Sequence, residues 1–184
     1  MHPLDPTVGL MITASFALLF GAAGVHKLRS RAEFERTLTA YDLLPEGRTR
    51  PVSVTIPVLE VGVAAGLLLP MTRDVASLAG VVLLDVYAAA MGLNLRRGRL
   101  ELDCGCLGFG RGHRISGALL WRNLILGLVL LAVGWLPWGS RPFGWMDAWT
   151  VAAGLSTVAL LYLTIDGLIE HWRHTLKRQG GLRT

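Results

Sequence analysis

Five long apolar stretches, separated by short polar segments, dominate the hydrophobic pattern of this sequence. A helix needs about 20 mostly apolar residues to cross the hydrocarbon core of a bilayer. Each stretch comes close to that length, so the pattern predicts five membrane-spanning helices. Since little sequence remains between them, we predict an all-α integral membrane protein with a single membrane domain over residues 1–184. The spans are expected at approximately residues 7–27, 52–70, 74–95, 117–137 and 147–169.

The segment between the first two stretches has a helical pattern of its own. Apolar Phe34 and Leu38 recur at helical spacing with charged residues between them, and Ser30 and Glu33 fit a capping box. The pattern predicts a short amphipathic helix at approximately residues 31–44, lying in the membrane interface. The alternative interpretation is a plain surface loop.

The overall composition supports a multi-pass membrane protein rather than a water-soluble domain. Hydrophobic residues make up 52% of the chain and charged residues only 17%. The formal net charge of +5 raises the question of nucleic acid. The sequence has no nucleic-acid-binding motif, and basic loops between membrane helices account for the charge. We therefore predict contact with the lipid bilayer and no nucleic-acid partner.

Lys and Arg residues concentrate on one predicted face of the membrane. With five spans, the segment 27–50, the loop 96–116 and the tail after residue 169 share a face, and together they hold 15 of the 18 Lys and Arg residues. The opposite face holds Arg73 and Arg141. Because cytoplasmic loops are enriched in Lys and Arg, this count predicts a cytoplasmic loop 96–116 and an N-terminus outside.

The only two cysteines of the chain, Cys104 and Cys106, flank a single glycine within the loop 96–116. A disulfide between residues so close requires a sharp backbone turn, which glycine permits. Such a bridge closes too small a loop to stabilise the fold much, and a strained bridge is readily reduced. We therefore predict that Cys104 and Cys106 are a catalytic pair for thiol–disulfide exchange. Two alternatives remain open, a metal site completed by Asp103 and His113 and two inert cysteines in a glycine-rich turn.

Several ionisable residues are expected at a similar depth to the cysteines or below them, because consecutive spans alternate in direction. An ionisable group inside a membrane span costs several kcal/mol unless it is paired. Arg122 lies inside the fourth predicted span, where we expect it to pair with a carboxylate. Such a pair either serves the chemistry of the cysteines or only holds helices together. The candidate partners of Arg122 are Glu60, Asp85 and Asp166.

The charged groups expected near the cysteines either favour or oppose formation of a cysteine thiolate, depending on the sign of their charge. Arg122 and His26 are predicted as supporting residues that stabilise a thiolate or hold helices together. Asp103 adjoins Cys104 and raises the pKa of its thiol by like-charge repulsion. The predicted supporting residues are thus His26, Glu60, Asp103, Arg122 and Asp166.

Several segments match one family of membrane proteins. The sequence resembles the MauE family of methylamine utilisation proteins, within the wider MauE/DoxX-like group. The likeness extends to about residue 137 and is most specific in the Asp-Cys-Gly-Cys run. The matching segments are Gly24-Val-His-Lys-Leu28, Glu33-Phe34, Leu43-Leu44-Pro45, the second span with Pro57, Glu60 and Gly62, and Asp103-Cys-Gly-Cys-Leu-Gly108.

The resemblance implies a bacterial inner-membrane protein that acts in the maturation of the methylamine dehydrogenase small (beta) subunit. It implies a thioredoxin-like partner and a thiol–disulfide oxidoreductase activity, forming or isomerising disulfides through Cys104 and Cys106. Likeness to quinone-linked disulfide-forming membrane enzymes makes a quinone the candidate cofactor, although no spacing here is diagnostic of a quinone site. The alternatives are a non-catalytic membrane scaffold that docks the thioredoxin-like partner and a metal-handling membrane protein. An exported substrate implies a cysteine pair outside the cell, opposite to the charge count.

Overall fold

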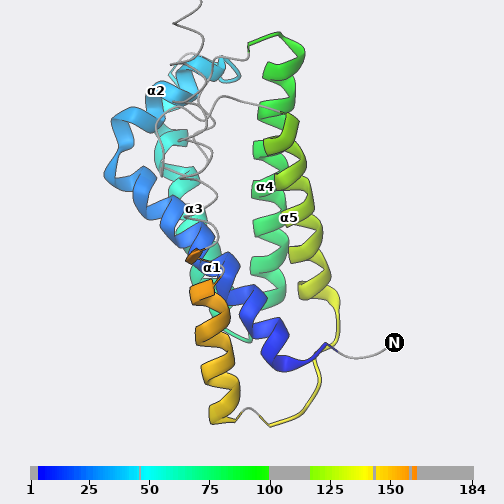
Figure 1. The fold of residues 1–184 in the computed structure, drawn as a ribbon. Helices are drawn as coiled ribbons and strands as arrows, with labels where there is room; N and C mark the ends of the chain where they lie inside the picture. The colour runs from blue at the N-terminus through cyan, green and yellow to red at the C-terminus, as the bar shows by residue number, and fades with distance from the viewer. Residues whose placement is uncertain (1–3, 46, 100–116, 143, 158, 161–184) are drawn as a thin grey trace, which may run out of the picture.

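The computed structural model describes residues 4–45, 47–99, 117–142, 144–157 and 159–160. All the regular elements within these residues are helices (Figure 1), which confirms the predicted all-α fold. Residues 145–157 and 159–160 are also helical. The named helices are α1 (Pro6–Arg29), α2 (Arg31–Tyr41), α3 (Thr49–Leu68), α4 (Arg73–Arg96) and α5 (Gly117–Trp135).

Four of these helices are long and apolar enough to cross a membrane within the described residues, namely α1, α3, α4 and α5. Each begins and ends within three residues of its predicted span. The fifth predicted span, 147–169, begins in the helical residues 145–157, and its part beyond residue 160 lies outside the described residues. The helices are consistent with the predicted bundle of about five spans.

The short helix α2 begins at Arg31 as predicted but ends at Tyr41 instead of residue 44. It ends there because Asp42 adopts the left-handed conformation, with φ 51° and ψ 45°. The predicted capping box is wrong, since the Ser30 side chain makes no capping hydrogen bond. The Ser30 backbone N–H instead donates to the His26 carbonyl and closes the last turn of α1.

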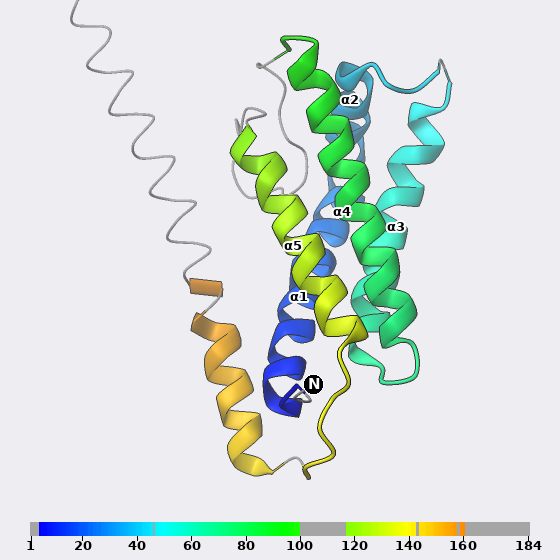
Figure 2. The same cartoon turned by 90° about the vertical axis from the view of Figure 1, so that its right-hand side faces the viewer.

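The bundle is held together by close packing of α1 with α3 and of α4 with α5, while α3 and α4 are joined by a short connection. Figure 2 shows the spans running side by side, each reversing the direction of the one before. Large apolar side chains from all four spans fill the centre of the bundle, namely Phe16, Phe20, Leu67, Leu84 and Leu130.

Alternating directions give the bundle two distinct ends (Figure 1). One end, here termed the loop end, contains α2, the end of α1, the start of α3, the end of α4 and the start of α5. The other, here termed the N-terminal end, is closed by backbone hydrogen bonds between Leu4 and the segment after α5. The Leu4 N–H donates to the Pro137 carbonyl at 2.9 Å, and the Gly139 N–H donates to the Leu4 carbonyl at 2.8 Å.

Candidate functional site

Three polar side chains from three different spans meet inside the bundle near the loop end. Lys27 of α1 forms an ion pair with Glu60 of α3. The Lys27 ammonium also donates a hydrogen bond to the Tyr87 hydroxyl of α4 at 2.9 Å. That hydroxyl donates to Glu60 Oε1 at 2.6 Å, so each member contacts both others. Lys27 is 2% exposed and Glu60 is 1% exposed, so the charges of this Lys27–Glu60–Tyr87 cluster lie away from solvent and lipid.

The sequence brings Lys27 and Glu60 together through a close crossing of α1 and α3. A Cβ atom at Gly24 would lie only 2.8 Å from the Pro57 carbonyl oxygen, so a glycine at this position allows the two backbones to approach. Lys27 and Glu60 each follow this crossing point by three residues, about one helical turn. The contact between the two backbones therefore positions the ion pair.

Aromatic rings complete the surroundings of the buried ammonium group. The Lys27 Nζ lies 4.7 Å from the ring centroid of Tyr87 and 5.3 Å from that of Phe34 in α2. Ring faces attract cations most strongly where water is excluded. The ammonium is thus stabilised by a carboxylate, a hydroxyl and two rings, which together replace the water that it lost on burial.

A small cavity beside the cluster collects unpaired polar atoms. Glu60, Tyr87, Arg122 and Asn123 line it together. Glu60 Oε2, Arg122 Nε and Asn123 Nδ2 are buried and have no hydrogen-bond partner within the part of the chain that the structure describes. One acceptor and two N–H donors around one cavity suit a very small polar guest, such as a water molecule.

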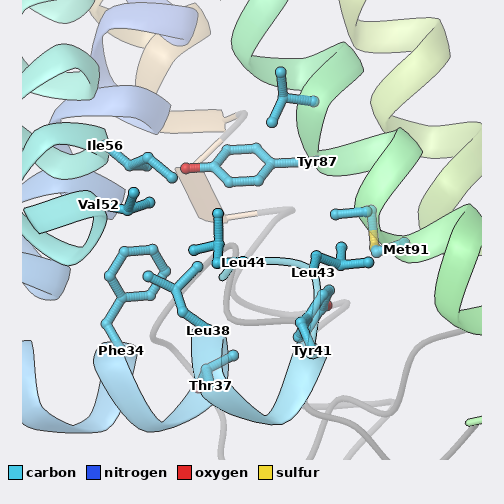
Figure 3. Close-up of a pocket in the computed structure, with 12 residues that line it drawn as sticks. Phe34, Thr37, Leu38, Tyr41, Leu43, Leu44, Val52, Ile56, Tyr87 and Met91 are labelled. Atoms are coloured by element: carbon cyan, nitrogen blue, oxygen red, sulfur yellow. The ribbon is translucent and has the colours of Figure 1, made fainter. Parts of the chain in front are cut away.

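Tyr87 also lines a larger apolar cavity of about 240 Å³ between α2, α3 and α4 (Figure 3). Its walls come from α2, the segment that follows it, α3 and α4. The Tyr87 ring forms part of this wall while its hydroxyl belongs to the buried cluster. An apolar cavity with a few converging polar groups is the usual form of a small-molecule site. The labelled wall residues include Phe34, Leu38, Leu44, Val52, Ile56 and Met91.

Of the supporting residues predicted from sequence, the structure describes His26, Glu60 and Arg122. Glu60 and Arg122 line the same small cavity, but the ion-pair partner of Glu60 is Lys27. Arg122 forms no ion pair with any carboxylate among the described residues. His26 lies in the last turn of α1, next to Lys27 in sequence.

The predicted catalytic pair lies outside the described residues. Cys104, Cys106 and Asp103 fall in the segment 100–116, and Asp166 falls after residue 160. The chain enters the segment 100–116 from the end of α4, which is tied to the end of α2. Two arginines make this tie, since Arg97 donates to the Asp42 carbonyl at 3.1 Å and Arg99 donates to the Asp42 carboxylate at 3.2 Å. The chain leaves the same segment at Gly117, also at the loop end.

Sequence reasoning missed two members of the buried cluster. The sequence predicts no partner for Lys27 and no polar role for Tyr87. The available signal was Glu60, because a carboxylate inside a span needs a partner and Lys27 is a nearby cation on an adjacent helix. Asn123 was also missed, although it adjoins Arg122 in sequence.

Comparison with known proteins decides the family. The family model described as methylamine utilisation protein MauE matches residues 5–138. The chain belongs to the MauE family. The matched residues include α1–α5, the Lys27–Glu60–Tyr87 cluster and both cysteines, so the resemblance predicted from the sequence is confirmed. Together with the four apolar helices, this membership makes the chain a multi-pass membrane protein.

Named relatives match over nearly their whole length. The methylamine utilization protein MauE of Paracoccus versutus is 36% identical over 164 residues, covering 89% of this chain and 88% of the relative. The protein of the same name from Methylorubrum extorquens is 33% identical, covering 89% of this chain and 86% of the relative. That from Paracoccus denitrificans is 34% identical, covering 88% and 87%. No solved structure matches the chain.

Proposed function

We propose that this protein serves methylamine utilisation as a membrane thiol–disulfide oxidoreductase in the maturation of the methylamine dehydrogenase small subunit. The observation that carries the proposal is the pair Cys104 and Cys106, the only cysteines of the chain, within the region that matches the MauE family model. Two cysteines around one glycine, in the segment that joins two membrane spans, suit reversible exchange better than permanent cross-linking.

The proposed exchange moves two electrons between the cysteine pair and a substrate disulfide. The thiolate of one cysteine attacks a substrate sulfur, forms a mixed disulfide and releases the first substrate thiolate, which takes up a proton. The thiolate of the second cysteine then attacks the sulfur of the first, closes the Cys104–Cys106 disulfide and releases the second substrate thiol. The reverse sequence oxidises two substrate thiols to a disulfide.

The thioredoxin-like partner restores the cysteine pair in this proposal. A dithiol of the partner reduces the Cys104–Cys106 disulfide, or a disulfide of the partner oxidises the dithiol, with the same two-electron balance. Isomerisation of a wrong disulfide needs no net electron transfer. Net formation of disulfides needs an electron acceptor, for which a membrane quinone is the candidate.

The buried residues near the loop end support this chemistry by fixing the frame. The Lys27–Glu60–Tyr87 cluster links α1, α3 and α4, and Arg122 and Asn123 bring α5 to the same small cavity. The segment with the cysteines connects α4 to α5, so a rigid bundle at this end limits the positions of its two attachment points. His26, Glu60, Asp103, Arg122 and Asp166 remain the proposed supporting residues.

Serine substitution tests the redox role. Cys104→Ser, Cys106→Ser and the double variant are expected to abolish formation of active methylamine dehydrogenase while the membrane level of the protein stays normal. One single variant should accumulate a mixed disulfide with another protein, visible on a non-reducing gel and lost on reduction. Full maturation in the double variant would overturn the redox role and favour a scaffold. Metal retained by the purified protein and lost in the double variant would favour metal handling.

Thiol labelling in intact cells tests the side of the membrane. A membrane-impermeant reagent that labels Cys104 and Cys106 after mild reduction would indicate a pair outside the inner membrane, as an exported substrate requires. Protection in intact cells with labelling in inverted vesicles would indicate a cytoplasmic pair, as the Lys and Arg count predicts. Asp74→Asn, at the exposed start of α4, leaves both cysteines and the buried cluster in place and serves as the expression-matched control.

A further inference from the structure

Asp85 occupies the middle of α4, eleven residues before the helix ends at Arg96. Its side chain is exposed, and it forms no hydrogen bond or ion pair with any other described residue. It lies level with Gly127 of α5, where a Cβ atom would come within 3.8 Å of Asp85 Oδ1. The carboxylate therefore stands beside the α4–α5 contact and faces outward from the bundle.

An exposed carboxylate at this depth is costly in a bilayer. Across the described spans α1, α3, α4 and α5, the other exposed charged side chains lie at helix ends, Lys27 and Glu60 are buried and paired, and Arg122 is half-buried with its Nε inside the bundle. Asp85 is the exception, a charge in mid-span with neither burial nor a partner in the described chain. Charged side chains inside membrane spans almost always face the bundle interior or pair with another polar group, so the exposed Asp85 calls for a partner.

The surface around Asp85 is shaped to receive another helix. A groove of about 700 Å³ runs from Asp85 to Arg96 along α4, with Leu120 and Leu124 of α5 as its other wall. At 1.5 Å per residue it extends for about 16 Å, roughly half the hydrocarbon thickness. The α4 side of the groove includes three small residues, namely Ala88, Ala89 and Gly92, beside Leu93 and Leu95. Small residues let a second helix approach closely.

The chemistry of Asp85 selects among possible occupants of the groove. A lipid acyl chain offers the carboxylate no hydrogen-bond donor. A second copy of this chain would present Asp85 to Asp85 in a symmetric contact, and the basic residue that lies furthest inside the described spans, Arg122, lines the small cavity beside Glu60 and not the groove. We propose that the groove between α4 and α5 binds a membrane-spanning helix of another protein, which carries a basic or amide side chain near its middle to pair with Asp85. This inference does not depend on the redox role of the cysteines.

Photo-crosslinking in native membranes tests the proposal. A photoreactive phenylalanine derivative at Leu93, which lies in the groove, is compared with the same group at Val58, which is exposed on α3. We expect a crosslinked product with a second membrane protein from position 93 and none from position 58. Combining the probe with Asp85→Leu should reduce that product at least tenfold, whereas Asp85→Asn, which keeps a hydrogen-bonding group, should retain most of it.

Two controls separate docking from folding. Purified Asp85→Leu should unfold at an equal or higher temperature than the unaltered protein, because an exposed charge has been removed from mid-span. Asp74→Leu, at the exposed start of α4, should leave the crosslink unchanged. The proposal is overturned if position 93 yields only lipid adducts, a dimer of this chain or an internal link to residues 161–184, or if Asp85→Leu leaves the crosslink intact.

Discussion

Two ion-pair clusters hold α1 at its two ends, and they differ in almost every physical respect. At the loop end, Lys27 and Glu60 are buried and paired side chain to side chain. At the N-terminal end, Arg141 donates to Asp5 at 3.2 Å and to Asp147 at 2.5 Å, and its side chain is 49% exposed. Thr7 of α1 donates to Asp147 at 2.7 Å and joins the same network.

The difference lies in what water does for each cluster. Arg141 and Asp5 are about half exposed, so water screens their pair and it contributes little to stability, whereas Asp147 and Thr7 of the same network are buried. Lys27 and Glu60 are buried, so bulk water does not screen their charges, and a lost partner leaves an unpaired charge in a low-dielectric interior. The half-exposed network therefore joins the start of α1 to Arg141 and Asp147, whereas the buried cluster constrains the bundle.

The largest effect is expected from removing one partner of the buried pair. Lys27→Ala should destabilise the protein by about 3–5 kcal/mol, because Glu60 is then buried without its cation. The double variant Lys27→Met with Glu60→Leu should recover much of this loss, since no unpaired charge remains. The midpoints of thermal unfolding in detergent for Lys27→Met, Glu60→Leu and the double variant measure the coupling. Additive losses would show that the pair is not the energetic unit proposed here.

The second-largest effect is expected at the close crossing of α1 and α3, which positions that ion pair. In Gly24→Ala the new Cβ would come within 2.8 Å of the Pro57 carbonyl, and the helices must separate at a cost of about 1–3 kcal/mol. Gly62→Ala is the matched control, because a Cβ there meets no atom within 4 Å. The control should be neutral or more stable by about 0.5–1 kcal/mol, since alanine favours helix. Equal effects at the two glycines would contradict the role of the crossing.

The spans could be predicted from the sequence because their signal is local. Twenty apolar residues in a row leave few structural alternatives, and each described span agrees with its prediction. The end of α2 was missed because Pro45 and Gly47 are strong local stop signals, yet Asp42 adopts a left-handed conformation first. Its contacts with Arg97 and Arg99, both distant in sequence, hold Asp42 in place and were invisible to a local pattern.

The buried cluster could be predicted only in part, for a related reason. Glu60 and Arg122 were recognised because charges inside apolar spans stand out in any sequence. Their partners depend on which helix crosses which, and the crossing at Gly24 is set by a close backbone approach that periodicity does not encode. Lys27 lies at the end of a predicted span, where the positive-inside rule alone explains a basic residue. Tyr87 looked like a core aromatic, and its hydroxyl bond to Glu60 needed the packed bundle to become apparent.

The smallest effect is expected at the N-terminal end, and it should depend on pH and salt. The hydrogen bond from Arg141, and then that from the Thr7 backbone, hold the pKa of the Asp5 carboxyl below its ordinary value of 3.8. Because the folded pKa is depressed, Asp5 stabilises the fold above about pH 4, and this contribution is lost as the pH falls through the folded pKa. Asp5→Asn should therefore lower the unfolding midpoint slightly near neutral pH and not at all in strong acid.

The salt dependence of Asp5→Asn and of further variants tests the difference between the two clusters. High salt should shrink the difference between Asp5→Asn and the unaltered protein, because exposed charges are screened. Arg141→Ala should give a small loss with the same salt dependence, whereas the loss in Lys27→Ala should change little, since the buried pair lies beyond the reach of dissolved ions. If the Asp5→Asn difference persisted in strong acid or at high salt, the N-terminal end would owe its stability to packing rather than to charge, and the contrast between the two clusters would be wrong.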